Sequence, residues 1–254
     1  MNPEIQLLAD LDAALAHVFS QVEQRPYGWV SYNTTNPAHH SANVVRRIHT
    51  DDPEDAIADI VAFYRSHGLK PRVRVNQLTV PTDLVARLQA HGFTTSPSAN
   101  QAMRWDGPAA ARHQGPSITV RRADASDVST LARIGGEDDP SAQHGWLGRK
   151  VRYQIGHPAI RYYLALLDGE PAGCAYVFQG PAAGLVEDVA TLSALRGRGV
   201  ATALIAVIQA EASTPLLLEV DAPNAVRIYA RAGFRDCGTN HETHCWLEGP
   251  LNRG

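Results

Sequence analysis

The spacing of apolar residues in the C-terminal half of the chain changes repeatedly between the period of a strand and the period of a helix. Short alternating or wholly apolar runs predict strands, and PLLLEV is typical of a strand that is buried on both faces. Over residues 200–211, Val200, Leu204, Val207 and Ile208 recur on one face of a helix. The pattern therefore predicts an α/β domain.

The ends of the predicted elements carry recognisable signals. Asp124 is placed to cap a helix, Asp168-Gly169 to form a hairpin turn, and Gly233 to end the last helix in a left-handed conformation. In chain order, the expected segments are SITVRRA, ASDVSTLARIG, AQHGWLGRKVRYQIG, the hairpin IRYYLALL-DG-EPAGCAYVF, GLVEDVATL, the helix of residues 200–211, PLLLEV, NAVRIYARAGF, and two short strands near 234–238 and 243–248.

The N-terminal half repeats part of this order. Residues 71–107 and 215–249 each contain Pro, an apolar strand, a helix, Gly-Phe and then Trp, and the interval from Phe to Trp is the same in both. A strand and a helix precede each segment, so we expect a truncated copy of one strand–helix–strand–helix–strand unit. The Pro/Ala/Gly-rich stretch near the middle predicts a linker at 108–117, between an N-terminal domain at 1–107 and a C-terminal domain at 118–254.

Composition narrows the class of protein. The chain has 254 residues, 44% of them hydrophobic, and a net charge of −3, which is ordinary for a globular protein and disfavours nucleic acid as a partner. Three widely spaced cysteines give no disulfide framework, the N-terminal segment has acids where a signal peptide has basic residues, and no apolar run is long enough to span a membrane. We therefore expect a cytoplasmic protein with neither nucleic-acid nor membrane partners. Lys70 and Lys150 are the only lysines beside many arginines, a bias typical of a G+C-rich bacterial genome.

The sequence RGRGVA, at residues 196–201, lies between a predicted strand and a predicted helix. The start of a helix exposes unpaired N–H groups and a partial positive charge. Glycines allow close approach of a ligand and positive φ, and arginines add donors that fit phosphate oxygens. The stretch therefore predicts a pyrophosphate site, although a glycine-rich turn with solvated arginines has the same signature. The residues expected to form it are Arg196, Gly197, Arg198, Gly199, Val200, Ala201 and Thr202.

Two other nucleotide motifs fit this region worse. The chain contains no G-x-x-x-x-G-K-[ST], and the dinucleotide fingerprint lacks its third glycine. The N-terminal copy has TDDPEDA at the equivalent turn, where four acids would repel an anion. We expect the anion site in the C-terminal copy alone.

Residues 196–201 resemble the R/Q-x-x-G-x-G/A motif of the GNAT superfamily of acyl-CoA-dependent N-acyltransferases. The resemblance extends over about residues 118–249 and includes VEDVATLSAL before the motif and YARAGF after it. It implies a mixed-sheet GNAT fold, with a catalytic domain at 118–254 and a degenerate GNAT-like unit at 1–107. It also implies acetyl-CoA as co-substrate and no metal.

The resemblance assigns the strand before the motif to the pantetheine arm. In the family this strand is splayed from its neighbour and its backbone binds the arm, which implies Val189, Ala190 and Thr191 beside the thioester. The family often has Asn seven residues before its helix Tyr, but here Asn224 stands five before. Asn224 is either a coenzyme A contact or the N-cap of this helix.

The resemblance also implies a base and an acid. Glu187 resembles the family's strand glutamate, which often acts as base through water, and Asp188 is the alternative base. Strand alternation would put Glu187, Val189 and Thr191 on one face and Asp188 on the other. Tyr229 resembles the general acid. A solvated strand-end acid and a packed core aromatic remain the plain alternatives for Glu187 and Tyr229.

The reaction needs both groups. An amine with a pKa near ~10.4 is protonated at neutrality, and a thiolate with a pKa near ~8.5 benefits from a proton when it leaves. The N–H of Val189 is placed to meet the oxyanion. We expect direct transfer of the acetyl group to a primary amine of a small molecule by a monomer or homodimer. A protein or peptide N-acetyltransferase and a non-catalytic acyl-CoA-binding regulatory module are the alternatives.

Several weaker signals favour structural roles. Cys237, His241, His244 and Cys245 match no common zinc spacing, and Cys174 has no local His or Asp to activate it as a nucleophile. The acidic run at 137–139 is either a solvated loop or an attractor for a cationic amine. The segment from Tyr27 to His40, rich in aromatic residues and histidine, favours core packing, with an acceptor-pocket wall as the alternative.

Overall fold

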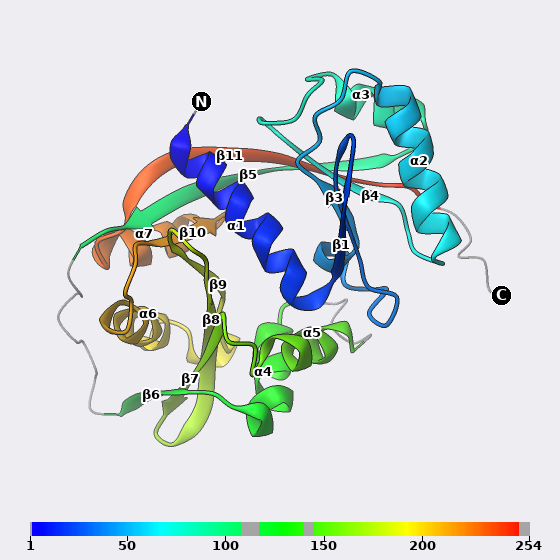
Figure 1. The fold of residues 1–254 in the computed structure, drawn as a ribbon. Coiled ribbons are helices and arrows are strands. Elements are labelled where there is room, and N and C mark those ends of the chain that lie inside the picture. Colours follow the sequence, from blue (N-terminus) through cyan, green and yellow to red (C-terminus); the bar gives the residue numbers. More distant parts are fainter. Residues whose placement is uncertain (1, 108–116, 140–144, 249–254) are drawn as a thin grey trace. The chain divides into compact units, whose positions relative to one another are not determined.

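The computed structural model describes residues 2–107, 117–139 and 145–248 (Figure 1). Its helices are α1 (Pro3–Phe19), α2 (Pro53–Ser66), α3 (Leu84–Ala90), α4 (Val128–Gly135), α5 (Trp146–Gln154), α6 (Val200–Ala210) and α7 (Pro223–Arg231). Its strands are β1 (Gln21–Arg25), β2 (Gly28–Tyr32), β3 (Val44–Arg46), β4 (Arg72–Asn76), β5 (Thr94–Trp105), β6 (Ile118–Arg122), β7 (Ile160–Leu167), β8 (Glu170–Gln179), β9 (Gly184–Thr191), β10 (Leu216–Val220) and β11 (Arg235–Trp246).

The strands form one mixed sheet in the order β1-β2-β3-β4-β11-β5-β10-β9-β8-β7-β6. Pairs β3–β4 and β9–β10 are parallel, as expected for strands joined through a helix, and the hairpin pairs are antiparallel. The α/β class with a mixed sheet is confirmed.

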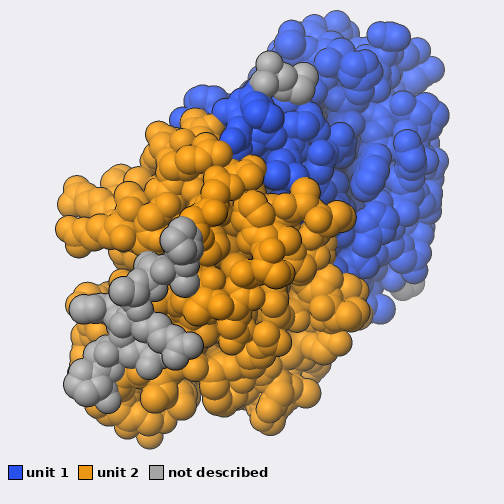
Figure 2. All heavy atoms as spheres, turned by 60° about the vertical axis from the view of Figure 1, so that its left-hand side comes forward, with its two compact units in different colours: residues 1–100, 239–254 blue, residues 101–238 orange. Residues whose placement is uncertain are grey.

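Two compact units divide the chain, Met1–Asn100 with Thr239–Gly254 and Gln101–Gly238 (Figure 2). This division differs from the boundary expected between residues 107 and 118. The reason is strand pairing: the end of β5 pairs with β10 in the second unit, and the end of β11 pairs with β4 in the first. Residues 108–116 of the expected linker lie outside the described residues.

The two halves of the chain share one order of elements. The series β3, α2, β4, α3, β5 matches the series β9, α6, β10, α7, β11. The two equivalent helix starts differ in their chemistry, because the Asp52 side chain accepts the Asp55 N–H at the start of α2, whereas α6 begins after Gly199 with no side-chain cap. The N-terminal copy therefore supplies its own anion at this helix start, and the C-terminal copy does not.

In the second unit, helices cover both faces of the strands β6–β9 (Figure 1). Helix α6 buries Leu204, Ile205 and Ile208 against one face, where Tyr163 and Val177 complete the core. Each such side chain contributes roughly 1.5–3 kcal/mol by burial. Helices α4 and α5 cover the other face, which carries Tyr162 and Tyr176. A layer of helices on each face fixes β8 and β9 between two cores.

In the first unit, α2 and α3 pack on one face of the strands. Val45, Val73 and Leu88 belong to that core and are almost fully buried. The opposite face is polar, and there Asp12 of α1 pairs with Arg46 of β3 at 2.6 Å and with Arg74 of β4 at 2.9 Å. The alternation of Val and Arg along β4 places these two sets of residues on opposite faces.

Some local expectations need correction. Residues 235–246 form the single strand β11 where two short strands were expected, and the β1–β2 hairpin was not foreseen. The predicted signals at Asp124, Asp168 and Gly233 are confirmed as a capping box, a tight turn and a left-handed glycine. Among the residues described, no helix is both long and apolar enough to cross a membrane.

Candidate active site

The loop between β9 and α6 has the backbone expected of an anion site. Gly197 and Gly199 have φ of 78° and 89°, a region that residues with a Cβ rarely adopt. The first hydrogen bond of α6 runs from the Ala203 N–H to the Gly199 carbonyl at 3.0 Å. The N–H groups of residues 200–202 therefore have no acceptor within the helix.

The two arginines of this loop are half exposed, and each faces a carboxylate. Arg196 pairs with Asp138 and also donates from Nε to the Thr191 carbonyl at 3.3 Å. Arg198 lies 3.6 Å from Asp168 at the β7–β8 turn. Because both side chains are more than half exposed, at 54% and 52%, either can turn toward a ligand at small cost.

The acidic segment after α4 contacts this loop. The Glu137 carboxylate accepts the Ser193 N–H at 2.5 Å, while Asp138 pairs with Arg196. The segment is therefore more than a solvated loop, because Asp138 pairs with Arg196 of the predicted anion site and Glu137 accepts from Ser193, three residues before that site. Sequence reasoning missed this contact because the partners are distant in the chain and share no pattern.

Strands β9 and β10 pair only at their beginnings. Among the described residues, the pairing comprises Leu216 with Gly184 and Leu217 with Leu185. Strand β9 continues to Thr191 and β10 to Val220, so the backbone of Val189, Ala190 and Thr191 has lost its ladder partner on that side. An unpaired strand edge offers N–H and C=O groups to an extended ligand.

A β-bulge interrupts β9 at Asp188. Asp188 has φ of 50°, and the register of β8 against β9 shifts so that Tyr176 lies opposite Glu187 and Cys174 opposite Ala190. Lys150 of α5 pairs with Asp188 at 2.6 Å and thereby stabilises this uncommon conformation.

The bulge overturns the expected alternation of side chains. Val189 packs against the core on the α6 side, whereas Glu187 lies opposite Tyr176, on the α5 side. Lys150 lies 5.3 Å from the Tyr176 ring centroid, so Asp188 also reaches the α5 side. One extra residue in the strand turns the following side chains to the other face.

Glu187 and Tyr229 lie within electrostatic range of one another. Tyr229 of α7 is 8% exposed, and burial together with the Glu187 carboxylate raises its pKa to about 12. Burial also raises the pKa of Tyr176, with Glu187 and Asp188 adding to the effect. The Glu187 carboxylate is therefore near enough to add to the rise in the pKa of Tyr229, and Tyr229 is protonated at neutral pH.

Gly173 of β8 is a residue that sequence reasoning missed. A Cβ at this position would lie 2.6 Å from Val200 Cγ1 and 2.7 Å from the Ala190 carbonyl oxygen. Its lack of a side chain lets the first turn of α6 approach β8 and β9. A glycine inside a strand was the available signal.

Asn224 is not the N-cap of α7. That position belongs to Ala222, with Pro223 at the first helical position, and Asn224 is an exposed residue of the first turn. Pro fits the first turn of a helix and sets its start one residue before Asn224. Contact of Asn224 with coenzyme A stays a prediction.

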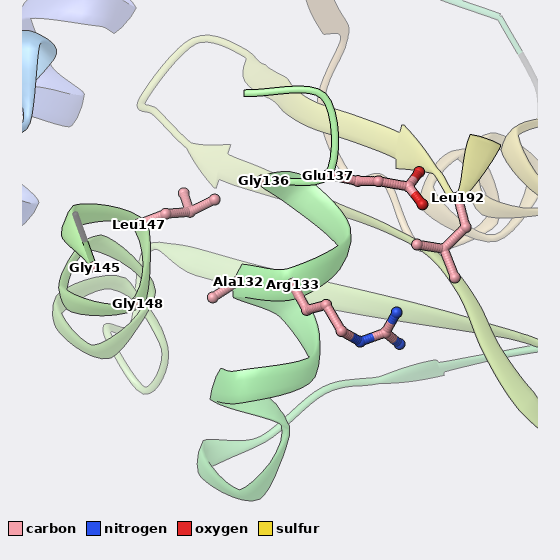
Figure 3. A pocket seen from close by; sticks show the side chains of 8 residues that line it. All are labelled: Ala132, Arg133, Gly136, Glu137, Gly145, Leu147, Gly148 and Leu192. Carbon is pink, nitrogen blue, oxygen red and sulfur yellow. The ribbon is translucent and has the colours of Figure 1, made fainter. Parts of the chain in front are cut away.

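A pocket of about 480 Å³ lies beside the acid contacts (Figure 3). Its walls are the end of α4, the beginning of α5 and Leu192, the residue that follows β9. Figure 3 shows the Glu137 side chain extending toward Leu192 at one edge of this pocket. The pocket therefore adjoins the β9–α6 loop.

The cysteines occupy structural positions. Cys174 is buried, and burial with the nearby Asp188 raises its pKa to about 12, which opposes a role as nucleophile. Cys237 and Cys245 are also buried free thiols.

Comparisons with known proteins agree with this geometry. Residues 131–234 match the acetyltransferase (GNAT) family. The span runs from α4 to Phe234 and includes the loop, the splayed strand and Tyr229. A comparison with curated proteins found no significant match.

Solved structures share the fold over most of the chain. A GCN5-related N-acetyltransferase from Kribbella flavida has a TM-score of 0.70 at 17% identity, over 97% of this chain and 96% of its own. A conserved protein of unknown function from Staphylococcus epidermidis has a TM-score of 0.68 at 11% identity, over 92% and 96%. A GCN5-related N-acetyltransferase from Sphaerobacter thermophilus has a TM-score of 0.55 at 18% identity, over 81% and 72%. The chain therefore has an acetyltransferase domain of the GNAT family at residues 131–234, within a GNAT fold that extends over nearly its whole length.

Proposed function

We propose that this acetyltransferase transfers the acetyl group of acetyl-CoA directly to a primary amine of a small molecule. The observation that carries the proposal is the position of the uncapped α6 N-terminus at the end of β9, whose edge is unpaired beyond Leu185. One end of this path suits a phosphate group, and the other suits an extended amide chain.

The residues divide the binding of acetyl-CoA between them. The N–H groups of residues 197–202 and the Arg196 and Arg198 side chains bind the pyrophosphate. The unpaired backbone of residues 189–191 binds the pantetheine arm, with the Val189 N–H toward the thioester oxygen. When the phosphate binds, Asp138 must release Arg196 and Glu137 must release the Ser193 N–H. Both contacts are exposed, so the cost of breaking them is small.

Glu187 is the proposed base that accepts the proton of the attacking ammonium, through water. Tyr229 donates a hydrogen bond to the departing sulfur. Its pKa of about 12 is well above the ~8.5 of a thiol, so complete transfer of its proton to a thiolate is uphill. The raised pKa therefore supports stabilisation of the thiolate by a protonated Tyr229, with the final proton supplied by the amine that has reacted.

The test is thiol release from acetyl-CoA against a panel of amines. Glu187→Gln should lower kcat at neutral pH and shift the rate to higher pH, since only acceptors that are already neutral then react. Tyr229→Phe should lower kcat with little change in the Kd for acetyl-CoA, because its hydroxyl acts on the departing sulfur.

Matched controls are available within the same domain. Tyr163→Phe removes a buried hydroxyl whose pKa is also raised to about 12. This hydroxyl donates a hydrogen bond to Glu211 at the end of α6 and belongs to no predicted site. Glu170→Gln changes an exposed glutamate at the start of β8. The assigned roles would be refuted if Glu187→Gln and Tyr229→Phe turn over as fast as these controls. If the wild type binds acetyl-CoA but acetylates no amine of the panel, a regulatory binding module would be favoured instead.

A further inference from the structure

The first unit contains a pocket of about 310 Å³, and its lining includes none of the residues assigned to acetyl transfer. It lies on the polar face of β4 and β11, opposite the core formed with α2 and α3. Its lining includes Lys70, Arg72, Arg74, Ser96, His244 and Trp246. The basic residues give this pocket a cationic wall.

Arg74 forms ion pairs with two acids of the same polar face. Its guanidinium lies 2.9 Å from Asp12 and 3.7 Å from Glu242, and Asp12 also binds Arg46 at 2.6 Å. Burial opposes ionisation of Asp12, but the two arginines outweigh it and lower its pKa to about 2. Arg46, Arg74, Asp12 and Glu242 therefore form a balanced cluster of two cations and two anions.

Lys70 is engaged as well. Its ammonium lies 2.9 Å from the Glu248 carboxylate, which also accepts the Trp246 Nε1–H at 2.8 Å. Glu248 is 64% exposed, so this pair sits at the rim of the pocket. Together these contacts hold Trp246 in place.

Arg72 is the exception. Its Nη1 is buried and has no hydrogen-bond partner among the residues described, where no carboxylate lies within ion-pair distance of it either. Burial lowers the pKa of Arg72, and the charges of Tyr64 and Glu248 offset this effect only in part. A buried donor without an acceptor is costly to the fold, so a ligand oxygen at Nη1 would be stabilising.

A second unsatisfied donor lies on a neighbouring strand. The Ser98 hydroxyl of β5 is buried and has no partner in the described part of the chain. Alternation places Ser98 on the same face of β5 as Ser96, which lines the pocket. Two independent donors therefore lack acceptors on this face.

We propose that this pocket binds a small organic carboxylate, with Arg72 as its main contact. The guanidinium fork matches the two oxygens of a carboxylate. Lys70 and Arg74 are each paired with carboxylates, whereas Arg72 is the cation of the lining that has no ion pair within the described residues, which suits a monovalent anion. Trp246 and Val44 supply an apolar surface for the organic part of the ligand.

The experiment is calorimetric titration of the full chain with sodium benzoate and, separately, with inorganic phosphate, in a buffer low in chloride. Benzoate should bind saturably at one site, and more tightly than phosphate. Arg72→Met should weaken benzoate binding at least ten-fold, with Arg72→Lys intermediate. Arg65→Met, at an exposed arginine of α2, and the pair Arg196→Ala with Arg198→Ala should leave it unchanged.

Thermal unfolding gives a second measurement. Without ligand, Arg72→Met should have a Tm equal to or above that of the wild type, since the change removes a buried donor that has no acceptor among the described residues. Benzoate should raise the Tm of the wild type but not that of Arg72→Met. Equal benzoate affinity in both proteins, a lower ligand-free Tm for Arg72→Met, or the absence of saturable binding would overturn the site. Phosphate binding that is tighter than benzoate binding in the protein with Arg196→Ala and Arg198→Ala, and that Arg72→Met abolishes, would overturn the choice of carboxylate.

Discussion

Gly173→Ala tests whether the close approach of α6 to β8 positions the phosphate-binding loop. The added Cβ would lie 2.6 Å from Val200 Cγ1 and 2.7 Å from the Ala190 carbonyl oxygen, each about 1 Å inside ordinary contact. Val200 is 1% exposed and β-branched, so its side chain has no alternative rotamer of low energy in the helix. The start of α6 must therefore move away from the strand.

Overpacking of this kind costs about 1–3 kcal/mol of unfolding free energy. A shift of the helix start also weakens at least one N–H contact to the phosphate, worth roughly 1 kcal/mol, so the Kd for acetyl-CoA should rise several-fold. Urea unfolding and calorimetry measure the two effects. Gly148→Ala, inside α5, is the control. The added Cβ would lie 4.0 Å from the Cβ of Ala132, which is ordinary contact, so this substitution should be neutral or stabilising.

A double variant sharpens the test. Val200→Ala removes one of the two clashing atoms, and the Ala190 carbonyl oxygen remains, so Gly173→Ala combined with Val200→Ala should be more stable than the sum of the two single effects predicts but not fully restored. If Gly173→Ala unfolds at the wild-type urea concentration and binds acetyl-CoA with wild-type affinity, the close approach does not position the loop. Strict additivity in the double variant would contradict the role of Val200.

Three further predictions follow from the site. Arg196→Ala with Arg198→Ala removes two charge-assisted contacts to phosphate of roughly 1.5–3 kcal/mol each. The double variant no longer has to break the two exposed ion pairs of these arginines, which offsets part of the loss, so the Kd for coenzyme A should rise about 30-fold or more. Unchanged affinity would remove the phosphate assignment. Asp138→Asn releases Arg196 from an exposed pair and should lower that Kd roughly two- to five-fold, less so at high salt; a weaker complex would show that Asp138 assists binding. The pKa of Tyr229 is raised from 10 to about 12 in the folded chain, so the stability it confers is complete below pH 10 and is lost as pH rises toward 12. The wild type should thus lose about 2 kcal/mol more than Tyr229→Phe between pH 10 and pH 12, measured by urea unfolding, and parallel curves would contradict the shift.

The sequence by itself determined the elements and the chemistry that local rules control. Apolar spacing located α6 and β10, and the turn residues Asp168 and Gly233 have the backbone conformations that their types favour. The residues Arg196 to Thr202 could be read as an anion site because helix starts and glycines act through neighbouring atoms. Each of these features depends on residues within a few positions of one another.

The tertiary structure alone decided what depends on partners distant in the chain. The bulge at Asp188 arises from the register with β8 and the ion pair with Lys150, and it reversed the expected faces of β9. The burial of Arg72 Nη1, which has no hydrogen-bond partner in the described part of the chain, likewise depends on which strands surround it. A one-residue change of register leaves composition and apolar spacing almost unaltered, yet it moves every following side chain to the other face, which is why the sequence pattern could not reveal it.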